Sequence, residues 1–71
     1  MTTIDDREID RLAWTLERTG ISAHEHDIAR LVDRAGPEGA SPVLIGVLGN
    51  RSEPECARIR AFGLVAMQIA A

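Results

Sequence analysis

The sequence of 71 residues contains no lysine and no tyrosine, and it has one cysteine, one tryptophan and one phenylalanine. The single cysteine, Cys56, excludes an internal disulfide and a framework of paired cysteines around a metal. The chain also lacks the motifs typical of phosphate loops, zinc peptidases and nucleophilic catalysis. We therefore expect no enzyme, no cofactor and no bound metal.

Long apolar runs are absent too. The longest stretch without a charge, residues 61–71 (AFGLVAMQIAA), is too short to span a bilayer, and the opening MTTIDDREID is acidic where a signal peptide would be basic and then apolar. We therefore expect a cytoplasmic protein with no membrane contact. All eight basic residues are arginine, and the net charge of −3 argues weakly against a general nucleic-acid binder.

Helix signals divide the first half of the chain. Thr3 precedes an acidic stretch and is expected to cap a helix, and Gly20 is expected to close it in a Schellman arrangement with Ile21 folded back onto Leu16. The GPEG segment, residues 36–39, ends the next helix, because glycine and proline both break helices.

Two S-x-x-E patterns are typical of capping boxes, in which serine and glutamate side chains satisfy the first backbone N–H groups of a helix. Ser22 with Glu25 predicts the start of the second helix. Ser52 with Glu55 predicts the start of the last one.

The segment at residues 42–49 is ambiguous. Ser41 and Pro42 favour a helix start, whereas the β-branched residues around Gly46 favour a strand. A strand would have no partner within the chain, so a helix is the better interpretation. We expect one small all-α domain over residues 1–71, with short loops and four helices at residues 4–19, 23–35, 42–49 and 53–70.

The first helix has two distinct faces. Its core face is expected to hold Ile9, Leu12, Ala13 and Leu16. The opposite face carries a row at i, i+4, i+7 and i+11, formed by Arg7, Arg11, Trp14 and Arg18. Tryptophan and arginine are enriched at interaction hot spots, so we predict that this row binds a partner protein. The alternative is a solvated face on which arginine stacks over the indole.

The last helix is apolar on more than one side. Its inner stripe is expected to hold Ile59, Phe62, Val65, Ala66 and Ile69. The opposite side carries Arg60, Leu64, Met67 and Gln68. Because small cores are often completed by association, we predict a homodimer that uses this second side.

The remaining reactive side chains give weak signals. His24 and His26 are two residues apart, so they diverge on a helix and form a poor chelate. His24 is expected to pack by its ring near a helix start, and Cys56 is expected to be a small, partly buried packing residue.

One stretch, LERTGISAHEHDIARLV, resembles a DNA-binding helix-turn-helix, because glycine, isoleucine and serine form its turn. It departs from that pattern at His26, where a small apolar residue is expected, and its second helix would present several acids to phosphates. The expected function is therefore protein–protein interaction by an adaptor, regulator or assembly subunit. A dimeric DNA-binding transcriptional regulator is the alternative.

Overall fold

A computed structural model describes residues 3–70, and all regular secondary structure in that range is helical. The elements are α1 (Asp6–Thr19), a short 3-10 turn η1 (Ile21–His24), α2 (Glu25–Ala35), α3 (Pro42–Gly49) and α4 (Glu55–Ala70). The predicted all-α architecture of four helices is confirmed, including the helix at residues 42–49. No helix in residues 3–70 is long and apolar enough to cross a membrane.

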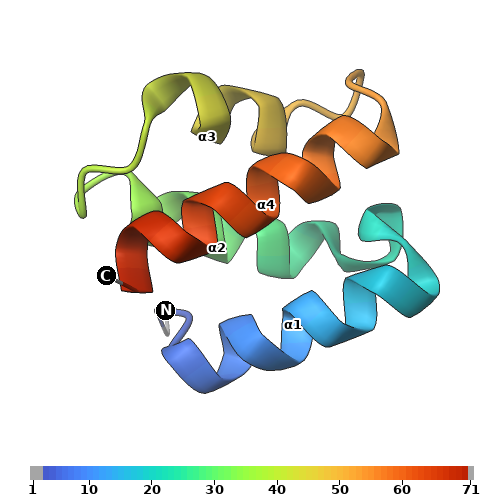
Figure 1. Cartoon of the computed structure of the whole chain (residues 1–71), viewed down its shortest axis with the longest axis horizontal. Coiled ribbons are helices and arrows are strands. Elements are labelled where there is room, and N and C mark those ends of the chain that lie inside the picture. Colours follow the sequence, from blue (N-terminus) through green and yellow to red (C-terminus); the bar gives the residue numbers. More distant parts are fainter. Residues whose placement is uncertain (1–2, 71) are drawn as a thin grey trace.

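The last helix, α4, organises the fold (Figure 1). It packs most extensively against α3, and it also contacts α1 and η1. The second helix, α2, contacts α3 and η1. The folded chain measures 25 × 24 × 23 Å along its three principal axes, so its shape is not elongated.

The core is built by one stripe from each helix and by the residues next to them. Its buried apolar members are Ile4, Ile9, Leu12, Leu16, Ile21, Ile28, Leu31, Ala35, Ala40, Leu48, Ala61, Phe62, Val65 and Ile69. The prediction for Ala13 is wrong, because this side chain is exposed at the edge of the α1 stripe. Of the stripe predicted on α4, Ile59 and Ala66 are only partly buried.

The first helix begins two residues later than predicted. Asp5, not Thr3, is the N-cap: its Oδ1 accepts from the Glu8 N–H at 2.8 Å. The Glu8 carboxylate accepts in turn from the Asp5 N–H at 3.3 Å. This reciprocal capping box satisfies the backbone N–H groups of both Asp5 and Glu8.

The predicted Schellman closure of α1 is also wrong. Gly20 has φ 83° and ψ 159°, which is an extended backbone with positive φ rather than a left-handed helical one. The Gly20 N–H donates to Leu16 O at 3.0 Å. The next N–H, of Ile21, donates to Glu55 Oε1 at 2.8 Å, so a side chain from α4 takes the bond that a Schellman motif would make locally.

The two predicted serine–glutamate capping boxes do not explain the helix starts. His24 is the N-cap of α2 and forms no side-chain cap bond, while the carboxylate of Glu25 is bound by an arginine of α4. The last helix begins at Glu55, whose carboxylate holds the Ile21 backbone. Ser41 does occupy the predicted N-cap position of α3, although its hydroxyl makes no cap bond. Both glutamates serve tertiary contacts instead of local ones.

Candidate protein-binding surface

The eight arginines of the chain divide into two groups. Within residues 3–70, one group lies within 4.0 Å of a carboxylate and contains Arg30, Arg34, Arg51 and Arg58. The other group has no carboxylate at that distance among the described residues and contains Arg7, Arg11, Arg18 and Arg60. Three members of the second group belong to the row predicted on α1.

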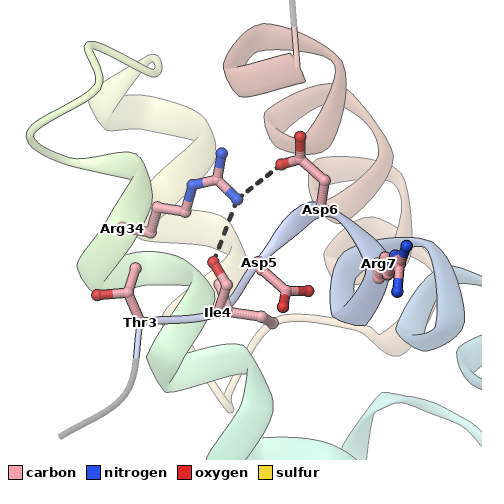
Figure 2. A pocket seen from close by; sticks show the side chains of 6 residues that line it. All are labelled: Thr3, Ile4, Asp5, Asp6, Arg7 and Arg34. Atoms are coloured by element: carbon pink, nitrogen blue, oxygen red, sulfur yellow. Dashed lines mark hydrogen bonds and ion pairs between the residues drawn. The ribbon is translucent and has the colours of Figure 1, made fainter.

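Two acids in the first turn of α1, Asp6 and Glu8, are bound by arginines of α2. Glu8 accepts from the Arg30 guanidinium at 2.7 and 3.1 Å. Asp6 lies 2.8 Å from Arg34, which also donates to Ile4 O at 3.1 Å (Figure 2). The two helices are therefore joined by ion pairs at the start of α1, and the arginines of α1 have no carboxylate within 4.0 Å among the described residues.

Electrostatics agree with this division. A hydrogen bond from Arg30 is the main reason that the pKa of Glu8 lies below its ordinary value, and the Asp5 N–H and the charge of Arg11 lower it further. Hydrogen bonds that Arg34 donates to the carboxylates of Glu38 and Asp6 raise the pKa of Arg34. These charges therefore stabilise one another inside the fold.

The row on α1 is exposed along its whole length. Trp14 has 64% of its surface exposed, and the Arg18 guanidinium lies 4.5 Å above the centre of its ring. Arg7 lines a shallow, open depression with Asp6 and Arg34, and Figure 2 shows it on the other side of Asp6 from the Arg34 guanidinium. We call Arg7, Arg11, Trp14 and Arg18 the Arg–Trp face.

One edge of the Arg–Trp face is acidic. Asp10 and Glu17 are both exposed and follow the side of α1 that is turned toward α4, where Asp10 borders a small depression with Ala66. The face therefore combines a cationic row with a parallel anionic edge.

The second surface predicted from the sequence lies on α4. Leu64 is 42% exposed and Met67 is 70% exposed, and Arg60 is exposed beside them. Gln68 differs, because its Oε1 accepts from the Ser41 N–H at 2.8 Å and so holds the start of α3. We call Arg60, Leu64, Met67 and Gln68 the α4 outer face.

The sequence did not identify Val43 of α3 as an exposed apolar residue, and it is 74% exposed. It follows Ser41 by two residues, and Ser41 is bonded to Gln68. Val43 is therefore an exposed apolar residue close in the chain to the bond between α3 and α4. The composition of α3 could have indicated this exposure, because five of its eight residues are large and apolar, more than one face of a short helix can bury. In the structure only Leu48 of them is fully buried.

A buried arginine was missed as well. Arg58 is only 3% exposed, and two of its nitrogens donate to the Glu25 carboxylate at 2.7 Å each. It also donates to Leu48 O at 3.1 and 3.0 Å. The pKa of Glu25 is lowered mainly by this hydrogen bonding. Arg58 therefore joins α2, α3 and α4, which is a structural role and leaves it unavailable to a partner.

The remaining candidate side chains do not come together. His24 is partly buried, and its Nε2 lies 2.8 Å from Thr19 Oγ1, while His26 is exposed. Cys56 is exposed, so the prediction of a partly buried packing residue is wrong. Among residues 3–70 there is no cluster of three or more side chains that could hold a metal ion.

The helix that would read DNA in a helix-turn-helix is α2. Its two arginines are both engaged: Arg30 with Glu8 and Asp27, and Arg34 with Asp6 and Glu38. Neither guanidinium is presented to solvent as an unpaired charge, so this geometry does not favour phosphate contacts by α2. Comparison of the chain with protein-family models, curated proteins and solved structures finds no match.

Proposed function

We propose that the protein is a non-enzymatic interaction module, a cytosolic adaptor, regulator or assembly subunit that binds a partner protein through its Arg–Trp face. One observation carries the proposal: an exposed tryptophan stands in a row of three arginines, none of which has a carboxylate partner in the described chain. Tryptophan and arginine are the residues that most often dominate binding energy at protein interfaces.

Two features favour a protein partner over a nucleic acid. The net charge is −3, and the arginines of α2 are already neutralised by acids of the same chain. The acidic edge formed by Asp10 and Glu17 would repel a phosphate backbone that lay along the Arg–Trp face. A dimeric DNA-binding regulator is the alternative function. The experiment below distinguishes it from binding to a partner protein.

A second candidate function is self-association through the α4 outer face. Leu64 and Met67 are large apolar residues exposed three positions apart on α4, the helix to which α3 packs. Exposed apolar residues in one area are typical of contact surfaces, and small domains often gain stability by forming homodimers.

Affinity capture from cell extract tests the partner proposal. The matched baits are wild type, Trp14→Ser and Arg51→Ser, because Arg51 is also an exposed arginine but lies off the Arg–Trp face. The proposal predicts proteins that bind wild type and Arg51→Ser, that are lost with Trp14→Ser, and that survive nuclease treatment. Identical proteins on all three baits, or binding that nuclease abolishes, would contradict it.

A further inference from the structure

We infer that the occupant of the Arg–Trp face is an acidic amphipathic helix of the partner protein. This inference rests on the proposed function and specifies the chemistry of the partner. It follows from three features of the face: its straight spacing, its arginines without an ion-pair partner among the described residues, and its acidic edge.

The spacing comes from α1 itself. Arg7, Arg11, Trp14 and Arg18 lie at i, i+4, i+7 and i+11, so they form one line along a helix of regular geometry. With a rise of about 1.5 Å per residue, successive members of the row are spaced about 6, 4.5 and 6 Å along the helix axis. A second helix that lies alongside α1 presents its own side chains at the same intervals, which makes it the natural complement to this row.

The charge of the row sets the sign of the partner. Asp6 and Glu8 are held by Arg34 and Arg30, and no carboxylate of the described residues lies within 4.0 Å of Arg7, Arg11 or Arg18. A carboxylate brought in by a partner can bind a guanidinium in the two-pronged geometry that arginine favours. The expected partner therefore has Asp or Glu facing each of Arg7, Arg11 and Arg18.

Trp14 determines what lies between those acids. Its ring is exposed, and the Arg18 guanidinium covers one side at 4.5 Å. Stacking holds the indole and the guanidinium together before binding, which reduces the side-chain entropy lost on association. An apolar side chain of the partner can cover the rest of the indole, so the expected acidic row is interrupted by one apolar residue.

The acidic edge limits the partner further. Asp10 and Glu17 run parallel to the row, so a uniformly anionic ligand gains at the arginines but is repelled at this edge. A helix with acids on one line and a lysine or arginine on the neighbouring line satisfies both. This pattern is available to a protein segment and not to a phosphate backbone.

Synthetic helical peptides test the inference by calorimetry and by Trp14 fluorescence. One peptide carries Glu at i, i+4 and i+11 with Leu at i+7, which complements a parallel arrangement, and a second exchanges the residues at i+4 and i+7 for an antiparallel one. The control has the same composition with its glutamates distributed around the helix. A random DNA duplex tests for unselective binding of polyanions.

We expect one patterned peptide to bind at least about tenfold more tightly than the control peptide and the duplex, a difference of about 1.4 kcal/mol. Arg11→Gln should weaken that binding, whereas Arg51→Gln should not, and circular dichroism checks that both variants fold. Equal binding of all ligands, or no binding of either patterned peptide, would overturn the inference. The proposed function is tested separately: it would be contradicted if capture of proteins from extract did not depend on Trp14.

Discussion

The guanidinium of Arg58 binds the carboxylate of Glu25 through two hydrogen bonds of 2.7 Å, and the two residues are 33 positions apart in the sequence. The same guanidinium donates twice to the backbone carbonyl of Leu48 at the end of α3. Three of the four helices thus meet at one buried charge.

Removing the negative charge from this pair should be costly. Glu25→Gln leaves the Arg58 charge buried without compensation, and we expect a loss of about 3 kcal/mol in the free energy of unfolding. Urea denaturation followed by circular dichroism measures it. Arg51→Gln is the matched control, because Arg51 reaches the same carboxylate only at 3.7 Å from an exposed position. Equal midpoints for Glu25→Gln and wild type would contradict the assignment.

Acid should weaken the fold through two carboxylates. The pKa of Glu25 is lowered by hydrogen bonding with Arg58, and that of Glu8 by hydrogen bonding with Arg30, from an ordinary value of 4.5. Because the folded-state pKa is lower, the stability from each pair is fully present above about pH 4.5 and is lost as the pH falls through the folded-state value.

Denaturation midpoints measured from neutral pH into the acid range test this dependence. The variants Glu25→Gln and Glu8→Gln each lack one of the two carboxylates, so each should lose less stability than wild type on acidification. A variant that loses as much as wild type would show that its carboxylate does not contribute.

Gly20 should tolerate alanine less well than Gly39 does. Both have positive φ, 83° and 86°, so alanine strains the backbone at each position by about 1 kcal/mol. At Gly20 the added Cβ would also lie 2.5 Å from Glu55 Oε1, which accepts from Ile21 N–H, whereas nothing lies within 4 Å at Gly39. We expect Gly20→Ala to be the more destabilised variant in thermal unfolding, and equal losses would contradict the role of Glu55.

Self-association should depend on the α4 outer face. We expect sedimentation equilibrium to give a dimer for wild type and a folded monomer for the double variant Leu64→Glu, Met67→Glu, because a buried unpaired carboxylate disfavours the contact. Ala13→Glu is the control, since Ala13 is exposed on another helix. A wild-type monomer at every concentration would show that the α4 outer face does not mediate self-association.

The sequence predicted the order and type of the helices well because glycine, proline and periodic apolar residues are local signals. It predicted the helix ends less well. Glu25 and Glu55 fit capping boxes by spacing, but their carboxylates bind Arg58 and the Ile21 backbone, which come from distant parts of the chain. Spacing along the sequence does not show which of two competing hydrogen-bond partners a carboxylate will meet.

The sequence predicted the exposed Arg–Trp face but not the buried Arg58. The Arg–Trp face follows from helical spacing and is exposed as expected. Arg58 was missed although it shares a line with Phe62 and Val65 at i, i+4 and i+7, because an arginine on a core stripe is normally assigned to its edge. Its burial depends on Glu25, and that pairing exists only in the folded chain.

Hydroxyl-radical footprinting with mass spectrometry most directly tests whether the Arg–Trp face is a binding surface. The oxidation rate of Trp14 is measured in purified, dilute protein and in cells that produce the protein, with His26, which is exposed on α2, as an internal reference. We predict that Trp14 is protected several-fold in cells relative to His26, as an indole covered by a partner would be. Equal Trp14 reactivity in both samples would contradict the account.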